Sequence, residues 1–239
     1  MIPQIVEQVQ NEPPQIRKLF VIKVTAIAAF MVIACFLIGT LLRNDVDSFF
    51  QSINQIWHKH IFCRIQLLWF AVYFTIDHFQ VLHEQKYLKW INLLIFVALS
   101  GFLVASCINY YGHDNAVIAS VFTLFLTIGF IVRALFDIVT FLFESDDYTD
   151  DYIWPYCLIP NVFIFLIKEF LPFPWLFSTI SGIMCLSFTQ ITLVKHFQQI
   201  MGNKSVAIPE NEFVHASLTL FTLILQAFIF YLALLFWNY

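Results

Sequence analysis

Long apolar runs separated by short polar connections dominate the chain. Seven of these runs reach about the 20 residues that an α-helix needs to cross the hydrocarbon core of a bilayer. They cover residues 19–42, 61–82, 88–110, 115–143, 153–171, 174–197 and 213–237. The pattern therefore predicts an all-α integral membrane protein with seven transmembrane helices.

The tail before the first run is too long and polar for a cleaved signal peptide. Its residues 1–18 read "MIPQIVEQVQNEPPQIRK", and the run that follows exceeds the 7–15 residues of a signal-peptide core. We expect residues 1–18 to remain as a cytoplasmic tail. Nearly every residue of 19–239 belongs to a span or a short connection, which predicts one seven-helix transmembrane domain.

Composition excludes a soluble domain. The chain is 60% hydrophobic and 12% charged, with a mean hydropathy of +0.79. Soluble domains carry about 25% charged residues. The chain has no dominant basic patch, so we expect it to contact the lipid bilayer and not to bind nucleic acid.

Basic residues near the spans predict the orientation, because cytoplasmic loops are enriched in Lys and Arg. A cytoplasmic N-terminus places eight basic residues on the cytoplasmic side and four on the other. The eight are Arg17, Lys18, Lys23, Lys86, Lys89, Arg133, Lys195 and Lys204, and the four are Arg43, Lys59, Arg64 and Lys168. The C-terminal Tyr239 then lies on the far side, unless the last segment is re-entrant.

The acidic stretch "ESDDYTDD" at 144–151 lacks the spacing and the closing Glu of an EF-hand. We read it as a solvated acidic loop, with a cation-attracting vestibule as the alternative. The five cysteines lie within or at the edges of apolar runs without metal-site spacing, which predicts buried free thiols. The sequence predicts no bound metal and no cofactor.

Ionisable residues inside spans are costly, so each is a functional candidate. Arg133 and Asp137 are four residues apart on one helix face and are expected to neutralise each other. Lys23, Arg64 and Lys168 lie near span ends, from which long side chains reach the headgroups. Asp77 and His78, near the end of the second span, are the candidates without such an explanation.

Two polar stripes mark the last two spans, at helical spacings of three and four. In the sixth span the stripe is Ser178, Gly182, Cys185, Thr189, Thr192 and His196. In the seventh it is His215, Thr219, Thr222 and Gln226. We expect the two stripes to face each other, as packing surfaces joined by hydrogen bonds or as a polar permeation path.

Four segments in this order resemble the Bax-inhibitor/lifeguard family of membrane proteins. "IRKLFVIKVTAI" (16–27) is similar to the family's basic entry into its first helix. "YYGHDNAVIASVFTLFLTIGF" (110–130) resembles its F-Y-x-x-x-A-V-I-x-A stretch. "HFQQIMGN" (196–203) resembles D-T-Q-x-x-M-G-N, and "PENEFVHASLTLFTLI" (209–224) resembles S-P-E-E-Y-x-x-A-x-L-x-L-Y-L-D-I-I.

The resemblance implies six helices around a central C-terminal seventh, in the endoplasmic reticulum or Golgi, or in the plasma membrane. It also implies cytoprotection and a pH-sensitive calcium leak, with calcium as permeant ion. The implied partners are other membrane proteins of apoptosis or calcium handling. In the family, an Asp of the sixth helix and an Asp of the seventh share a proton that controls the leak.

The chain departs from the family at both aspartates. Alignment on "QIMGN" places His196 at the first position, whereas a second register would place Phe188 there, off the polar stripe. The second position is Leu223. An imidazole can respond to pH, but its positive charge is the wrong sign for holding Ca²⁺, which prefers oxygen ligands. The sequence therefore predicts a divergent member with altered or lost leak control.

Two other classes stay open. A non-conducting membrane interaction protein, viral or lineage-specific, is consistent with the loss of both aspartates. An intramembrane hydrolase is the weaker alternative, because His215 stands alone where an H-x-x-x-H would be required, and a G-x-S-x-G motif is missing. We therefore expect no enzyme activity.

Overall fold

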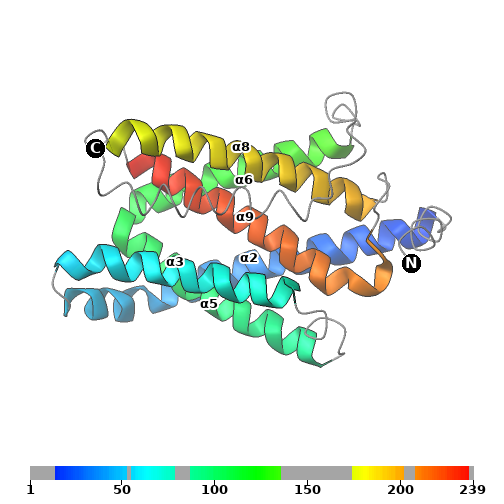
Figure 1. Cartoon of the computed structure of the whole chain (residues 1–239). Helices are drawn as coiled ribbons and strands as arrows, with labels where there is room; N and C mark the ends of the chain where they lie inside the picture. The colour runs from blue at the N-terminus through cyan, green and yellow to red at the C-terminus, as the bar shows by residue number, and fades with distance from the viewer. Residues whose placement is uncertain (1–13, 53–54, 79–86, 136–173, 202–207, 237–239) are drawn as a thin grey trace.

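The computed structural model describes residues 14–52, 55–78, 87–135, 174–201 and 208–236, and all regular structure in these ranges is helical. The helices run roughly along one direction and form an elongated bundle (Figure 1). They are α2 (Pro14–Gln51), α3 (Gln55–His78), α5 (Leu88–Tyr111), α6 (His113–Leu135), α8 (Pro174–Met201), the 3-10 turn η3 (Glu210–Glu212) and α9 (Phe213–Phe236).

These helices overlap every expected span except the fifth, since residues 153–171 lie outside the described ranges. Three stretches are long and apolar enough to cross a membrane, namely Ile16–Phe49, Leu88–Tyr111 and Glu210–Ala233. A shorter apolar stretch, Arg64–Ile76, lies in α3. The described part of the chain thus supports a helical membrane protein, with three of the seven expected spans meeting the length and apolarity of a crossing.

Helix α2 is much longer than its apolar run. Its 38 residues correspond to about 57 Å, against about 30 Å for the hydrocarbon core of a bilayer. It begins at Pro14, within the expected tail, because proline is favoured at the first helical position, where its missing N–H costs nothing. At the other end the helix continues through polar Arg43 and Asp47, which are compatible with a helix although not with lipid.

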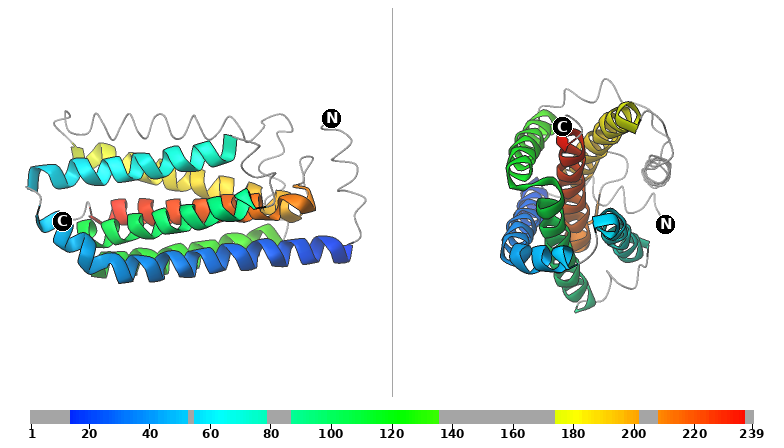
Figure 2. Two further views of the ribbon diagram at one scale, coloured as in Figure 1. Left: turned by 90° about the horizontal axis from the view of Figure 1, so that it is seen from below. Right: turned by 90° about the vertical axis from the view of Figure 1, so that its left-hand side faces the viewer.

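Helix α9 lies in the middle of the described helices. It packs against α2, α5, α6 and α8, and the view along the bundle shows it surrounded by them (Figure 2). The burial follows from its composition, since apolar residues are found all round the helix. Its fully buried side chains include Phe221 and Phe228. This arrangement makes α9 the element against which the surrounding helices are placed.

Glycines bring α2 and α5 into close contact. A Cβ added at Gly101 would lie 2.4 Å from Ile38 Cγ2, and one added at Gly39 would lie 2.7 Å from Val104 Cγ1. Further along, the Asn109 side chain donates a hydrogen bond to the Arg43 carbonyl at 3.2 Å. Small residues permit such close approach of helices where lipid supplies no hydrophobic driving force. These two helices run in parallel and share the most extensive contact among the described helices.

The turn between α5 and α6 depends on Gly112. Its φ of 88° lies in a region that favours glycine, and its N–H donates to the Ile108 carbonyl at 3.0 Å to end α5. The Asn115 side chain donates to the Tyr111 carbonyl at 2.8 Å. The turn sends α6 back antiparallel to α5.

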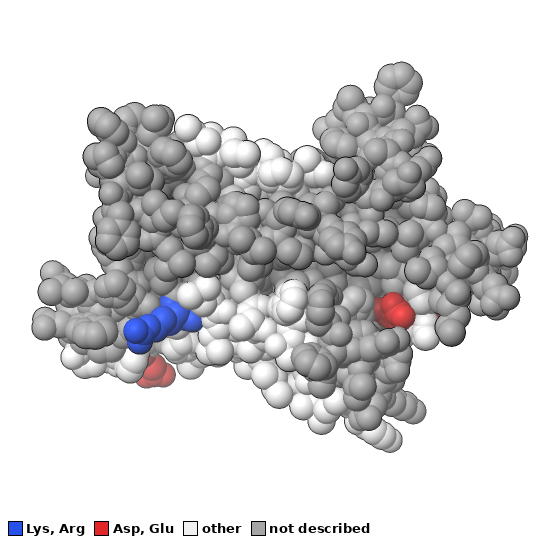
Figure 3. All heavy atoms as spheres, in the orientation of Figure 1, with Lys and Arg blue, Asp and Glu red and all other residues white. Residues whose placement is uncertain are grey.

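Large apolar side chains are exposed along the outside of the bundle. Phe30 is 68% exposed and Leu41 is 77% exposed on α2, and Phe125 is 72% exposed on α6. On the face shown in Figure 3, the described charged side chains lie toward the two ends, and the described surface between them is uncharged. Apolar surface of this extent is typical of a protein whose outer faces contact lipid.

Candidate functional site

The candidate site lies where the end of α8, the start of α9 and the start of α2 meet. We call this region the α8–α9 junction and define it by Arg17, His196, Gln199, Ile208 and Ala216. Its hydrogen bonds join residues as far as 191 positions apart in sequence. Helices α8 and α9 are neighbours here because the connection between Met201 and Ile208 is short.

His196 is held at the junction by the backbone of α9. Its ring is 7% exposed, and Nε2 lies 3.0 Å from the Ala216 carbonyl oxygen. A carbonyl oxygen can only accept, so Nε2 carries a hydrogen and donates. A buried hydrogen bond of this kind contributes about 1 kcal/mol. His196 therefore links the last turns of α8 to the first turn of α9 through a side-chain hydrogen bond.

Arg17 closes the same junction from α2. Its guanidinium donates to the Gln199 carbonyl at 2.6 Å and to the Ile208 carbonyl at 2.7 Å. It also lies over the Phe20 ring, 4.7 Å from the centroid, and the residue is only 8% exposed. The Ile208 N–H donates to the Gln199 carbonyl at 3.4 Å. Both ends of the α8–α9 connection are thus tied to one side chain.

The sixth-span stripe is mostly buried along α8. Gly182, Cys185, Thr189 and His196 are buried, and Thr192 is half-buried. The hydroxyl of Thr189 donates to the Cys185 carbonyl and that of Thr192 to the Phe188 carbonyl, both at 2.9 Å. These hydroxyls are satisfied within their own helix. The side chain of Ser178 lies outside the described residues.

The seventh-span stripe lies inside the bundle on α9. Thr222 and Gln226 are buried, and the Thr222 hydroxyl donates to the Leu218 carbonyl at 2.8 Å. His215 and Thr219 are half-buried. The Thr219 hydroxyl oxygen is buried and makes no hydrogen bond to any residue that the structure describes.

The stripes of α8 and α9 do not face each other near the junction, contrary to expectation. Ala216, Leu220 and Leu223 of α9 pack with Leu193 and Ile200 of α8 in one apolar cluster. The members of the α9 stripe lie one residue before these in sequence, which turns them by about 100° around the helix. Apolar side chains therefore fill most of the contact between the two helices near the junction.

The two positions at which the resemblance places carboxylates are separated along α9. His196 contacts Ala216, whereas Leu223 lies seven residues further on, about 10 Å along the helix axis. Leu223 is 1% exposed within the apolar cluster. The arrangement offers this pair of residues no shared proton and no oxygen ligands for calcium.

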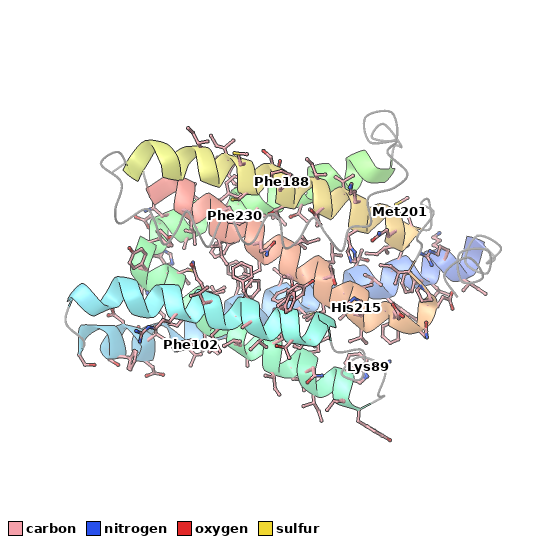
Figure 4. All side chains as sticks on the ribbon, viewed as in Figure 1. Lys89, Phe102, Phe188, Met201, His215 and Phe230 are labelled. Carbon is pink, nitrogen blue, oxygen red and sulfur yellow. The ribbon has the colours of Figure 1, made fainter. Side chains whose placement is uncertain are left out.

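A small cavity adjoins the other side of the α9 start. Its volume is about 10 Å³, enough for roughly one water molecule. Lys89 and His215 line it. Figure 4 shows these two side chains on the neighbouring helices α5 and α9. The Lys89 ammonium lies 5.2 Å from the centroid of the Phe213 ring. The other lining residues are Ile76, Asn92, Leu93, Val214 and Leu218. The cavity is too small to form a path for a hydrated ion.

Several sequence-based candidates fall outside what the structure describes. The side chains of Asp77, His78 and Arg133 are not described, although their backbones belong to α3 and α6, and Asp137 lies outside the described residues. The acidic stretch 144–151 also lies outside them. Lys23 and Arg64 are exposed, as expected for side chains that reach the headgroups. Cys35, Cys107 and Cys185 are buried thiols that form no disulfide.

Metal ligation finds no support within the described ranges. There, no group of three or more His, Cys, Asp or Glu side chains is placed to hold a metal ion. The oxygen-bearing members of the stripes, such as Thr189 and Thr222, bond to carbonyls of their own helices.

The role of Arg17 is the feature that the sequence did not reveal. The sequence groups Arg17 with Lys18 as a basic flank, because both precede an apolar run. Its partners are backbone carbonyls about 180 to 190 residues away. Every residue has a backbone carbonyl, so the sequence does not indicate which ones accept from Arg17. The one available hint is Phe20 three residues later, on the same helix face, where a guanidinium can stack.

Comparison with known proteins adds no relative. No family model, no curated protein and no solved structure matches the chain. The likeness to the Bax-inhibitor/lifeguard family therefore stays a prediction that rests on the four segments 16–27, 110–130, 196–203 and 209–224.

Proposed function

We propose that the chain is a divergent Bax-inhibitor/lifeguard-like protein of internal membranes, cytoprotective and modulating calcium or ion leak. In this proposal seven spans cross the membrane, six of them around α9, and the N-terminus is cytoplasmic. The four similar segments support it, as does the packing of α9 against α2, α5, α6 and α8. The exposed apolar surface of the described helices supports the location in a membrane.

The observation that carries the proposal is the contact between His196 and the Ala216 carbonyl. His196 occupies the position at which the resemblance expects an acidic residue, and it fastens α8 to the central helix. A carboxylate in its place would repel the carbonyl oxygen and attract cations, whereas the imidazole donates to it. The proposed consequence is a junction that is closed at rest and leaks little.

Calcium flux into reconstituted vesicles tests this proposal. Wild type is expected to leak slowly, and His196→Asp is expected to leak severalfold faster, because the new carboxylate cannot donate to Ala216 and attracts Ca²⁺. His196→Gln retains an N–H donor on a long side chain and should stay close to wild type. Ser187→Ala, which removes an exposed hydroxyl on the same helix, is the matched control.

Two results would count against altered leak control. One is a fast wild-type leak with the pH response of a di-carboxylate sensor, since the chain has no such pair at these positions. The other is a His196→Asp leak equal to that of Ser187→Ala in protein that remains monodisperse and helical. Equal protein content in the vesicles has to be established for every variant.

A non-conducting interaction protein is the second candidate, and the close packing among the described helices favours it. The hydroxyls of Thr189, Thr192 and Thr222 bond within their own helices, and the cavity beside His215 holds about one water molecule. This candidate predicts that flux stays at the level of empty vesicles for wild type and His196→Asp alike. Membrane proteins should nevertheless co-purify with the chain.

An intramembrane hydrolase remains the weakest alternative. It would require a bound metal or a nucleophile aligned with a base, and the resemblance implies neither. Elemental measurement on the purified protein decides this point. Stoichiometric zinc would contradict our expectation that the chain is not an enzyme.

A further inference from the structure

Arg17 joins three parts of the chain that are far apart in sequence. It lies in the first turn of α2, and its guanidinium reaches Gln199 in the last turn of α8 and Ile208, two residues before η3. The two donor to acceptor distances, 2.6 and 2.7 Å, are short, as expected for charge-assisted hydrogen bonds.

The Gln199 carbonyl is a favourable place for a cation. It belongs to the last four residues of α8, whose carbonyls lack partners within the helix. The partial negative charge of the helix dipole is concentrated at the same end. Arg17 therefore acts as a cap of α8 that is supplied by another helix. Its second bond, to Ile208, extends this cap to the far end of the α8–α9 connection.

The geometry suits arginine and not lysine. A guanidinium presents several N–H donors in a fixed plane, so one side chain can serve two carbonyls and still stack on an aromatic ring. Arg17 does all three, through Gln199, Ile208 and Phe20. The neighbouring Lys18 is exposed, which shows that a basic side chain at this end need not be buried.

We propose that Arg17 is a latch that keeps the α8–α9 junction closed, so that the start of α2 controls the opening of the last turns of α8. His196 lies three residues before Gln199 and is fastened to Ala216. The two contacts hold the same turns of α8 from two sides. Releasing Arg17 frees the end of α8 and both ends of the connection, while the apolar contacts deeper in the bundle remain.

Amide hydrogen exchange followed by mass spectrometry tests the latch in the full-length protein. Arg17→Ala is expected to speed exchange at least about tenfold in peptides covering 195–201 and 208–216, because two charge-assisted hydrogen bonds are lost. Arg17→Lys should show most of this increase, since one ammonium cannot replace the planar fork. Lys18→Ala is the control and should exchange like wild type.

A disulfide across the connection provides a rescue. Gln199→Cys and Ile208→Cys, added to Arg17→Ala, place two thiols where the backbone N of Ile208 and the O of Gln199 are 3.4 Å apart. Oxidation should return exchange in 208–216 toward wild type, and reduction should remove this protection. A rescue that follows the redox state shows that Arg17 acts by holding the two ends together.

Two outcomes would overturn the latch. One is unchanged local exchange in Arg17→Ala. The other is an equal rise in exchange across α3, α5 and α6, which would mean general destabilisation. The latch concerns the same end of the bundle as the proposed function, but its test does not depend on calcium flux. A negative result in the flux experiment would thus not contradict the latch, and unchanged hydrogen exchange in Arg17→Ala would not contradict the proposed function.

Discussion

Most buried hydroxyls in the described helices donate to a carbonyl four residues earlier, as Thr123 does to Ala119 at 2.7 Å. One buried hydrogen bond instead joins side chains of two helices. The indole N–H of Trp69 on α3 donates to the Ser100 hydroxyl on α5, at 2.7 Å. Ser100 donates in turn to the Phe96 carbonyl, and the Phe96 ring stacks on Trp69 with centroids 5.3 Å apart. This network fastens α3 to α5.

Replacing Ser100 should therefore lower the stability of the protein more than the small size of its side chain suggests. Ser100→Ala leaves the Trp69 N–H buried without its acceptor, which is expected to lower the free energy of unfolding by about 1–3 kcal/mol. Thr75→Ala on α3 removes an exposed hydroxyl that bonds only locally to Ala71, and it should cost less than about 0.5 kcal/mol. Thermal unfolding in detergent measures both.

A double-mutant cycle separates the hydrogen bond from packing. Trp69→Phe removes the donor itself, so adding Ser100→Ala to it should cost little further stability. Additive losses in the double variant would mean that the bond between Trp69 and Ser100 does not carry the effect.

Single residues also show where sequence reasoning reaches its limit. Lys23 and Arg64 lie exposed, which is compatible with the predicted reach to the headgroups, since that reach depends only on local sequence. Arg17 has the same local features and is buried, because its partners are two distant carbonyls. Helical spacing marks His196 as a candidate, but the sequence does not indicate its acceptor on Ala216, for the same reason.

At the scale of whole helices, two glycines allow α2 and α5 to pack closely. At Gly101 a Cβ would meet both Ile38 Cγ2 and Ile38 Cβ, at 2.4 and 2.6 Å, so a rotamer change of Ile38 cannot remove the overlap. The helices would have to move apart. Overpacking of this kind typically costs about 1–3 kcal/mol.

Gly101→Ala is accordingly expected to destabilise the protein by about 1–3 kcal/mol. Ala98→Val on the same helix adds volume at an exposed position and should change stability by less than about 0.5 kcal/mol. Thermal unfolding compares the two. Equal stabilities would show that α2 and α5 are less closely packed than the glycine contacts indicate.

Helix positions were more predictable than helix ends. The apolar runs at 88–110 and 213–237 correspond closely to α5 and α9, because for these helices the apolar length and the helical length coincide. For α2 they do not, since the run 19–42 ends where charged residues begin, whereas the helix spans Pro14–Gln51. Hydropathy indicates which residues can contact lipid, whereas the helix itself can extend beyond them into water.

At the scale of the whole molecule, the described residues distribute charge unevenly between the two ends of the bundle. The starts of α2 and α5 and the end of α8 contribute Arg17, Lys18, Lys89 and Lys195 to one end, which also includes Glu210 and Glu212. At the opposite end the described charged residues are mostly acidic. Among the residues described there are Arg43, Asp45, Asp47 and Asp114. Because basic residues are retained on the cytoplasmic side, the end that contains the α8–α9 junction is expected to face the cytoplasm.

Protease protection in microsomes tests this orientation, using tags at both termini. With the junction end in the cytoplasm, a protease added from outside should remove an N-terminal tag. With seven spans, a C-terminal tag should be digested only after detergent opens the vesicles. An N-terminal tag that is protected in intact vesicles would contradict the orientation.

Glycosylation provides an independent measurement of the same orientation. Asn203 heads an N-K-S acceptor sequence between α8 and α9, and acceptors are modified only on the lumenal side. We expect Asn203 to carry no glycan, whereas an N-x-T acceptor added after Tyr239 should be modified. Mass measurement before and after glycosidase treatment distinguishes the two sites. A glycan on Asn203 would place the junction, with Arg17 and His196, on the lumenal side, and the charge argument would then have failed.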